Sequence, residues 1–240
     1  MQPTPIRSVA AVSFDVTGTL IHCPRLAEIY AEVLGRHGVE VDPERLGELV
    51  PIVWKELSCR VVDGRDRFAS HPGGDRGFWS EFLGRIAAYL EIAHPGPFAA
   101  AELYDRFARA DAWELYPDVE PTLDRLASRR LRLVVTSNWD ARLPDLLEDL
   151  GLARRFEAIV YSWRVGYEKP HPAIFEAVTV ELELAPAAVL HIGDRRLADL
   201  EGARAAGMRA LLLGRDGIDG DLARLDELPT HLSRPGDVLD

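Results

Sequence analysis

The sequence predicts an α/β fold in which helices flank a parallel sheet and an all-helical segment is inserted after the first strand. The first observation is that short, nearly continuous apolar runs alternate with stretches of helical periodicity, a pattern typical of βαβ units. Strands that are apolar at nearly every position are buried on both faces, which favours parallel pairing. The second observation is that residues from about His22 to Asp111 contain helical patterns and hardly any strand candidate.

The first expected strand is Val9–Phe14, which is followed directly by Asp15 and closed by Gly18. Later apolar runs of the same character give the remaining strands, expected at Leu131–Thr136, Ala158–Tyr161, Ala188–Ile192 and Arg209–Leu213. The helices of this α/β part are expected between the strands, at Glu120–Arg129, Arg142–Leu150, Pro172–Leu182 and Asp199–Ala206.

The inserted segment has the periodicity of helices, expected at Leu26–His37, Pro43–Arg60, Arg76–Ile92 and Pro97–Ala110. It would lie over the carboxyl ends of the strands, where open α/β sheets bind ligands, so we interpret it as a lid. Its glycine-rich stretch Gly64–Gly77 is the expected mobile loop. We therefore divide the chain into a core domain of residues 1–21 and 112–240 and a helical cap domain of residues 22–111.

The composition excludes several classes of protein. A formal net charge of −11 at pH 7 argues against a nucleic-acid partner, because such proteins carry a clustered excess of Lys and Arg. Two cysteines are too few for a disulfide framework, residues 1–9 lack the features of a secretory leader, and the apolar runs are shorter than a membrane span. We expect a cytoplasmic protein that binds neither nucleic acid nor membrane, of unknown oligomeric state.

Polar side chains follow two of the expected strands at the edge where open α/β sheets bind ligands. Asp15 directly follows the first strand, and Gly18 permits a tight turn there. The alternative for Asp15 is a solvated turn in which it caps a helix. Ser137 and Asn138 follow the next strand and offer hydroxyl and amide groups, which suit the spread charge of a transferring phosphoryl group. The alternative for this pair is a small polar turn.

Two further segments add charged groups. Lys169 is one of only two lysines in the chain, and Pro170 disfavours a helix there, so we expect a loop lysine that holds Asp15 ionised and pairs with a phosphate oxygen. Asp194 ends another apolar run and Asp199 follows it; carboxylates are hard ligands that suit Mg²⁺. Each acidic residue alone is compatible with a helix cap, but polar groups at four strand ends of one sheet indicate one site.

The order of these groups is similar to that of the four motifs of the haloacid dehalogenase superfamily, here Asp15-x-Thr-Gly-Thr, Ser137-Asn138, Lys169-Pro170 and Gly193-Asp194-x-x-x-x-Asp199. The resemblance covers essentially the whole chain and implies a Rossmann-like core with a helical cap of the first type. A narrower resemblance is to the branch of rhythmically expressed gene 2-like and haloacid dehalogenase-like hydrolase domain-containing 3 proteins. It is carried by Phe14–Leu20, Ala112-Trp113, residues 137–143 and Leu190–Met208.

The resemblance implies a Mg²⁺-dependent hydrolase, a phosphatase or phosphotransferase that acts on a small phosphorylated metabolite through an aspartyl phosphate. Asp15 would be the nucleophile, Ser137 a donor to a phosphoryl oxygen and Lys169 an electrostatic clamp. Thr19 and Asn138 would contact the substrate. The Mg²⁺ ligands would be Asp15, the backbone carbonyl of Thr17, Asp194 and, directly or through water, Asp199.

Thr17 departs from the pattern of phosphatases in this superfamily, which usually carry an Asp there that protonates the leaving group and later activates water. A positioned general acid or base contributes about 10² to 10⁴ in rate, so turnover should be slow. Cation-pumping ATPases have the same Asp-x-Thr-Gly-Thr segment and form an aspartyl phosphate that persists. We therefore expect that Asp15 is phosphorylated and that the intermediate is hydrolysed slowly.

Two other functions stay open. A 2-haloacid dehalogenase of this superfamily also uses the first Asp and lacks the second, although Asp194 and the acidic loop favour a metal-dependent reaction. A catalytically weak domain that binds a phosphorylated ligand for regulation would explain Thr17. Retention of the four other motif residues counts against that alternative; these are Asp15, Ser137, Lys169 and Asp194.

Other conspicuous side chains receive structural interpretations. His22 and Cys23 are expected to pack or to face the substrate, since two ligands make no tetrahedral metal site. His191 is expected to be a hydrogen-bonded core histidine. Packing between lid helices or at the lid hinge is expected of Trp54, Trp79 and Trp113. Three of the cationic residues of the lid are Arg60, Arg65 and Arg67. They are expected to lie at exposed helix ends, and contact with an anionic substrate is the alternative.

Overall fold

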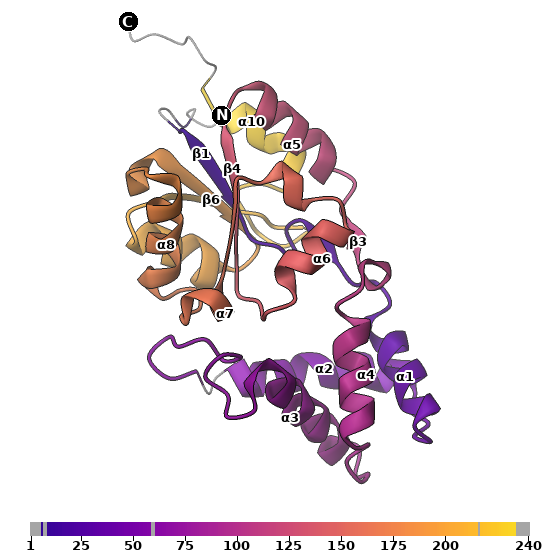
Figure 1. Cartoon of the computed structure of the whole chain (residues 1–240). Coiled ribbons are helices and arrows are strands. Elements are labelled where there is room, and N and C mark those ends of the chain that lie inside the picture. Colours follow the sequence, from indigo (N-terminus) through magenta and orange to yellow (C-terminus); the bar gives the residue numbers. More distant parts are fainter. Residues whose placement is uncertain (1–5, 7–8, 59–60, 216, 234–240) are drawn as a thin grey trace, which may run out of the picture.

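A five-stranded parallel sheet forms the centre of the upper layer of the molecule in Figure 1. The structure is a computed structural model and describes residues 6, 9–58, 61–215 and 217–233. The strands are β1 (Ala11–Phe14), β4 (Arg132–Ser137), β5 (Ala158–Tyr161), β6 (Val189–Gly193) and β7 (Arg209–Leu212), in the order β5-β4-β1-β6-β7. The predicted α/β fold and its five strands are confirmed, with ends that differ by one or two residues.

The register of the strands places the ends of β1, β4 and β6 together. Phe14, the last residue of β1, lies beside Val135 of β4 and Ile192 of β6. Because all of these pairs are parallel, the residues that follow the three strands emerge at one edge of the sheet. That edge is where the polar residues of the sequence motifs are brought together.

Helices cover both faces of the sheet, which explains why its strands are apolar throughout. On one face lie α5 (Val119–Ser128), α6 (Leu143–Asp149) and α10 (Leu228–His231), and on the other lie α8 (Pro172–Leu182) and α9 (Gly202–Ala205). Helix α5 buries Val119, Leu123 and Leu126, which share one helical face. The shorter elements are α7 (Ser162–Val165) and the 3₁₀ turns Ala153–Arg155, Pro186–Ala188 and Leu225–Glu227.

The helix predicted at Asp199–Ala206 differs from the expectation at its start. It begins as a π-helix at Arg196–Glu201 and continues into α9. The side chain of Asp199 points back to its own turn, where its Oδ2 accepts a hydrogen bond of 2.9 Å from the backbone N–H of Arg195. Single π-turns of this kind are frequent at functional sites, and this one directs Asp199 toward the sheet edge.

The helical segment lies under the carboxyl ends of the strands (Figure 1) and has its own hydrophobic cluster. Its helices are α1 (Leu26–Arg36), α2 (Pro43–Ser58), α3 (Gly74–Tyr89) and α4 (Pro97–Arg106), followed by a 3₁₀ turn at Ala110–Ala112. The four predicted helices are therefore present. The chain passes between the two layers through an antiparallel ribbon of β2 (Ile21–His22) and β3 (Glu114–Leu115).

The stretch Gly64–Gly77 is more firmly held than its composition indicates. The Gly64 carbonyl accepts a 2.9 Å hydrogen bond from the Glu168 N–H, and the Asp66 N–H donates to the Gly166 carbonyl over 3.0 Å. Phe68 is buried, and α3 begins at Gly74, so the last residues of the expected loop are helical. Glycine content alone did not reveal these hydrogen bonds to a distant part of the chain.

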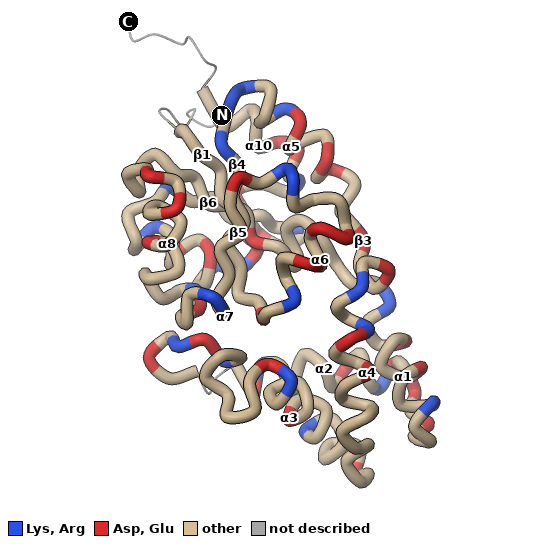
Figure 2. The backbone as a smooth tube through the Cα atoms, viewed as in Figure 1, with Lys and Arg blue, Asp and Glu red and all other residues tan. Residues whose placement is uncertain are grey.

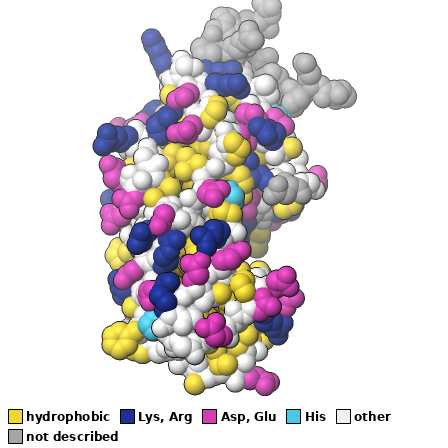
Figure 3. All heavy atoms as spheres, turned by 90° about the vertical axis from the view of Figure 1, so that its right-hand side faces the viewer, with side chains coloured by type: hydrophobic (Ala, Val, Ile, Leu, Met, Phe, Trp, Pro, Cys, Tyr) yellow, Lys and Arg dark blue, Asp and Glu magenta, His cyan; other side chains and the backbone are white. Residues whose placement is uncertain are grey.

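Charged residues are distributed over both layers. Figure 2 shows acidic and basic positions interspersed along the backbone. On the face shown in Figure 3, basic and acidic side chains lie close together around the level where the helical segment meets the sheet layer. Within the described part of the chain, no helix has the length and the apolar character needed to cross a membrane.

Candidate active site

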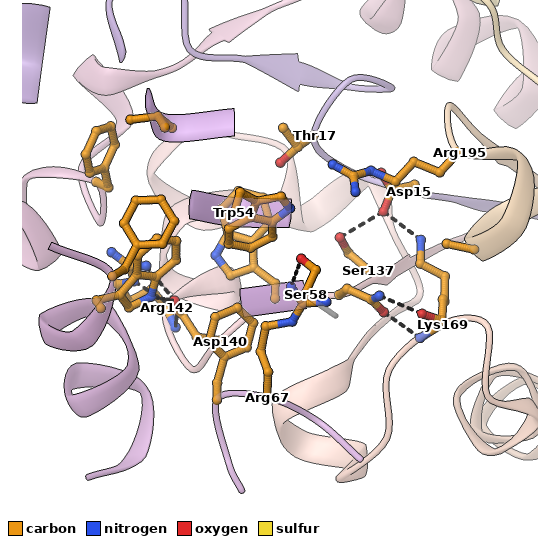
Figure 4. A pocket seen from close by; sticks show the side chains of 18 of the residues that line it. Asp15, Thr17, Trp54, Ser58, Arg67, Ser137, Asp140, Arg142, Lys169 and Arg195 are labelled. Atoms are coloured by element: carbon orange, nitrogen blue, oxygen red, sulfur yellow. Dashed lines mark hydrogen bonds and ion pairs between the residues drawn. The ribbon is translucent and has the colours of Figure 1, made fainter. Parts of the chain in front are cut away.

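Asp15 stands at the centre of the group of side chains that the sheet edge brings together (Figure 4). It follows β1, while Ser137 ends β4 and Lys169 lies in the loop before α8. The Oδ1 atom of Asp15 accepts a 2.9 Å hydrogen bond from the Ser137 hydroxyl and a 2.7 Å hydrogen bond from the Lys169 ammonium. No described residue donates a hydrogen bond to Oδ2, so one oxygen of the carboxylate is fixed and the other is left for a ligand.

Lys169 is buried and its ammonium group is fully engaged. Besides Asp15, it donates to the Thr136 carbonyl over 2.9 Å and to Asp199 Oδ1 over 2.5 Å. Burial alone would lower the pKa of Lys169, but the carboxylates of Asp15 and Asp199 outweigh burial and raise this pKa. The side chain is therefore a permanent cation beside Asp15.

Asn138 fixes the backbone of Lys169. Its Oδ1 accepts a 2.6 Å hydrogen bond from the Lys169 N–H, and its Nδ2 donates to the Lys169 carbonyl over 2.9 Å. Both ends of the amide are used in this way, although Asn138 also lines the cavity described below. The structure thus places Asn138 as the support of the lysine loop.

A buried chain of polar groups lies beneath Asp199. His191 Nε2 lies 3.1 Å from Asp199 Oδ1, and Ser13 Oγ lies 2.8 Å from His191 Nδ1 and 2.7 Å from Thr136 Oγ1. Burial is the main cause that lowers the pKa of His191. Burial would raise the pKa of Asp199, but Lys169 and His191 outweigh it and lower this pKa. His191 is confirmed as a hydrogen-bonded core histidine.

Asp15, Asp194 and Asp199 form a cluster of carboxylates with ligand oxygens within 4.8 Å of one another. The Oδ1 atom of Asp194 is buried and accepts a hydrogen bond from no described residue. Burial, together with the charges of the other two carboxylates, raises the pKa of Asp194 to about 7. An oriented set of carboxylate oxygens with one orphaned oxygen fits a hard divalent cation.

The oxygens of this cluster are not equally available. Both oxygens of Asp199 already accept hydrogen bonds from protein groups, so Asp15 and Asp194 offer the free ones. Two glycines leave room for the cluster. A Cβ atom on Gly18 would lie 2.5 Å from Asp194 Oδ2, and Gly18 has a φ of +83°, which favours glycine. A Cβ atom on Gly193 would overlap the Asp199 carboxyl group.

A cavity of about 460 Å³ opens between the sheet edge and the helical segment (Figure 4). The polar groups that line it on the side of the sheet include Asp15, Thr17, Ser137, Lys169 and Arg195. The remaining wall includes nine aromatic residues, which are Tyr30, Trp54, Phe68, Trp79, Phe82, Tyr104, Phe107, Trp113 and Trp139. The sequence interpretation assigned Trp54, Trp79 and Trp113 to packing alone, whereas all three also line the cavity.

The helical segment is joined to the sheet layer by the ion pair of Arg67 with Glu168 and by a hydrogen bond from Trp79 to Asp140. Arg67 donates to both oxygens of Glu168 over 2.8 and 2.7 Å. Arg142 is paired with Asp140 Oδ2 over 2.5 Å, and the indole N–H of Trp79 donates to the same oxygen over 2.6 Å. Neither link was predicted from the sequence, because each joins residues that no local pattern relates.

A model of the haloacid dehalogenase-like hydrolase family matches residues 9–207 of the chain. The chain belongs to this family. Human haloacid dehalogenase-like hydrolase domain-containing protein 3 is 30% identical over 216 residues, which cover 88% of this chain and 84% of the human protein. A glyceraldehyde 3-phosphate phosphatase from Methanopyrus kandleri is 31% identical over 236 residues, which cover 97% and 96% of the two chains. The resemblance found in the sequence is confirmed.

Solved structures of the fold include enzymes of two activities. A haloacid dehalogenase-type phosphatase from Thermococcus onnurineus aligns with a TM-score of 0.64 at 22% identity, covering 92% of this chain and 96% of its own. An L-2-haloacid dehalogenase from Xanthobacter autotrophicus aligns with a TM-score of 0.63 at 25% identity, covering 86% and 78%. The similar TM-scores leave the choice between these reactions to the site residues.

In this haloacid dehalogenase-like hydrolase, the two threonines of the first motif lie in different places. Thr17 is exposed and lines the cavity, whereas Thr19 is fully buried and does not line it. The turn after β1, closed by a 2.8 Å hydrogen bond from the Leu20 N–H to the Val16 carbonyl, rotates Thr19 inward. Its carbonyl accepts a 2.9 Å hydrogen bond from Arg215. The structure therefore gives no support to the expected substrate contact of Thr19.

His22 stacks on Tyr116 with ring centroids 4.5 Å apart, and Cys23 packs against the helical cluster, which confirms the packing interpretation. Arg67 lines the cavity, and Arg65 lies over the ring of Tyr167. Arg60 is outside the described residues.

Proposed function

We propose that this hydrolase is a Mg²⁺-dependent phosphatase or phosphotransferase that moves the phosphoryl group of a small metabolite to Asp15 and then to water or another acceptor. The observation that carries the proposal is the asymmetry of Asp15. One of its oxygens is held by Ser137 and Lys169, and the other has no donor among the described residues. Residues 22–111 act as a cap domain that closes the cavity over the core domain of residues 1–21 and 112–240.

The polar groups around Asp15 have defined roles in this proposal. The free oxygen of Asp15 attacks phosphorus, the bond from phosphorus to the leaving oxygen breaks, and Ser137 and Lys169 stabilise the phosphoryl oxygens. Asp15, Asp194 and the backbone carbonyl of Thr17 would hold Mg²⁺, with Asp199 supporting the shell through Lys169 or a water. Mg²⁺ would supply positive charge for the phosphoryl oxygens.

Thr17 determines how fast the aspartyl phosphate is hydrolysed. Water must attack the phosphorus of the aspartyl phosphate and lose a proton, and the threonine hydroxyl is too weak a base to accept it near neutral pH. A general base contributes about 10² to 10⁴ in rate, so hydrolysis of the intermediate limits turnover. This supports a slow phosphatase, or a phosphotransferase whose second substrate is a better nucleophile than water.

The test is the release of phosphate from a generic phosphomonoester, with and without Mg²⁺. The wild type should release phosphate slowly and only with Mg²⁺, Asp15→Asn should release none, and Thr17→Asp should raise kcat by about 10² or more. No gain in Thr17→Asp together with full activity in Asp15→Asn would overturn the proposal.

A dehalogenase is the second candidate, because Thr17 is compatible with a reaction that needs no acid at that position. The orphaned oxygen of Asp194 favours the metal-dependent reaction instead. Halide release from a 2-haloacid in the presence of a chelator, lost in Asp15→Asn, would reverse this ranking. Binding of a phosphorylated ligand without any turnover would favour a regulatory domain.

A further inference from the structure

The aromatic wall of the cavity and the threonine at position 17 point to the same kind of substrate. We propose that the site acts on a phosphomonoester of an aromatic hydroxyl, a flat phenol-type group esterified to phosphate. This inference rests on the proposed phosphoryl transfer to Asp15 and narrows its substrate class.

The shape and chemistry of the cavity wall favour a planar ligand. The rings of Trp54 and Trp79 are nearly parallel, with centroids 5.9 Å apart and an interplanar angle of 21°, and Phe68 continues the stack from Trp79 at 5.9 Å and 22°. These rings come from the helical segment and line the same cavity as Asp15; Trp54 is labelled in Figure 4. Flat, polarisable walls favour a planar aromatic body over a short hydroxylated chain.

One indole N–H in the aromatic wall has no hydrogen-bond acceptor among the described residues. The indole N–H of Trp54 is buried and donates to no described residue, although Trp54 lines the cavity. The indole N–H of Trp79 differs, because it donates to Asp140 over 2.6 Å. A buried donor normally finds an acceptor, so the ligand is expected to carry an oxygen or ring nitrogen on its aromatic body that accepts this hydrogen bond.

The threonine at position 17 favours a substrate whose leaving group departs without being protonated. In the first step the free oxygen of Asp15 forms a bond to phosphorus, and the bond between phosphorus and the ester oxygen breaks. With threonine at position 17 nothing there protonates that oxygen, so it must leave as an anion and take its proton from solvent afterwards. A phenol has a pKa of about 10, whereas an aliphatic alcohol is about as weak an acid as water, with a pKa of ~15.7. The phenolate leaves unaided far more readily.

Arg195 provides a site for the charge of the departing phenolate. It lines the cavity together with Asp15 and Thr17 (Figure 4). Its guanidinium group makes no hydrogen bond or ion pair with any described residue. A guanidinium group stays protonated, so it stabilises a leaving anion without replacing the missing acid.

The experiment compares kcat/KM values of the Mg²⁺-loaded enzyme, because this ratio reports events up to departure of the leaving group and is not affected by slow hydrolysis of the intermediate. The substrates are phenyl phosphate, 1-naphthyl phosphate and glycerol 3-phosphate. Acetyl phosphate, which has a good leaving group and no ring, tests phosphorylation of Asp15 by itself. Phenyl and naphthyl esters have leaving groups of similar acidity, so a difference between them measures contacts with the ring.

The wild type is expected to prefer both aryl phosphates to glycerol 3-phosphate by about 100-fold or more, and naphthyl to phenyl. Thr17→Asp should raise kcat/KM for glycerol 3-phosphate by about 10² to 10⁴ and change the aryl values less. Trp54→Leu should lower the value for naphthyl phosphate roughly two- to tenfold and leave labelling by acetyl phosphate intact, which shows that the variant is folded. Phe98→Ala, which removes an exposed ring of the helical segment, should change nothing.

Two other results have separate meanings. If acetyl phosphate labels Asp15 while glycerol 3-phosphate equals the aryl phosphates, or naphthyl phosphate gains nothing over phenyl phosphate, the aromatic substrate is wrong and the proposed phosphoryl transfer stands. If no compound, acetyl phosphate included, labels Asp15, the proposed function itself fails.

Discussion

Lys169 donates a hydrogen bond from its ammonium group to Asp15 across 2.7 Å, although the two residues are separated by 154 positions in the sequence. The side chain of Lys169 is only 2% exposed and that of Asp15 is 11% exposed. The contact is made by one carboxylate oxygen, so it fixes the orientation of Asp15, while no described residue donates a hydrogen bond to the second oxygen. The proposed chemistry depends on this pairing.

Replacement of Lys169 by methionine should destabilise the protein. The variant leaves Asp15 and Asp199 as buried carboxylates without their cation, and loss of one partner of a buried ion pair costs about 3–5 kcal/mol. Urea unfolding measures the change. The chain contains its own control, because its only other lysine, Lys55, is exposed on α2, and Lys55→Met should stay within about 0.5 kcal/mol of the wild type. Equal stabilities of the two variants would contradict the central role of Lys169.

Mg²⁺ should raise the melting temperature of the wild type. Asp15, Asp194 and Asp199 hold like charges within 4.8 Å of one another, and a divalent cation that binds the folded state removes their repulsion and stabilises the protein by mass action. Calorimetry with added Mg²⁺ and with a chelator measures the shift. Asp194→Asn should lose most of this shift. Asp219→Asn, which changes a fully exposed carboxylate, should keep it; a shift that survives in Asp194→Asn would place the cation elsewhere.

Much of the site was predictable from sequence because of one property of parallel sheets. Asp15, Ser137 and Asp194 each follow or end an apolar run, and the carboxyl ends of parallel strands share an edge, so their proximity follows from the strand pattern. Lys169 was distinguished by its position before proline in a chain that otherwise uses arginine. These site residues could therefore be identified without knowing how side chains pack.

The contacts between the two layers were not predictable in the same way. Arg67 and Glu168 are 101 positions apart, and Trp79 and Asp140 are 61 apart. Helical periodicity identifies which face of a helix is buried but not which residues of another layer it meets. The position of Thr19 was missed for a related reason, since the direction of a side chain in a tight turn depends on backbone dihedral angles that the motif does not specify.

Arg67 should contribute much more to stability than an exposed arginine with a similar partner. The side chains of Arg67 and Glu168 are 10% and 6% exposed, so Arg67→Ala leaves a buried carboxylate and should cost about 3 kcal/mol. Arg76 and Asp105 form a matched pair whose side chains are 58% and 65% exposed, and Arg76→Ala should cost less than about 1 kcal/mol. Urea unfolding compares the two. Limited proteolysis should also cut residues 64–72 faster in Arg67→Ala; equal cutting and equal stability would refute the link.

Cys23 should react slowly with alkylating reagents. Burial raises the pKa of its thiol to about 11, from an ordinary value of 9.0, and only the thiolate reacts. In a Cys59→Ser background, iodoacetamide should therefore label Cys23 about 100-fold more slowly at pH 8 than it labels a free cysteine. The rate should still be rising about tenfold per pH unit at pH 10. A rate that levels off near pH 9 would show that the thiol is not shielded.

The most direct measurement for Asp15 as nucleophile is mass spectrometry of the peptide that contains it, after rapid mixing of the Mg²⁺-loaded enzyme with acetyl phosphate and an acid quench. The wild type should carry one phosphoryl group on Asp15, Thr17→Asp should carry less at steady state because it hydrolyses the intermediate faster, and Asp15→Asn should carry none. A phosphoryl group on a different residue, or turnover by Asp15→Asn at the wild-type rate, would contradict the account.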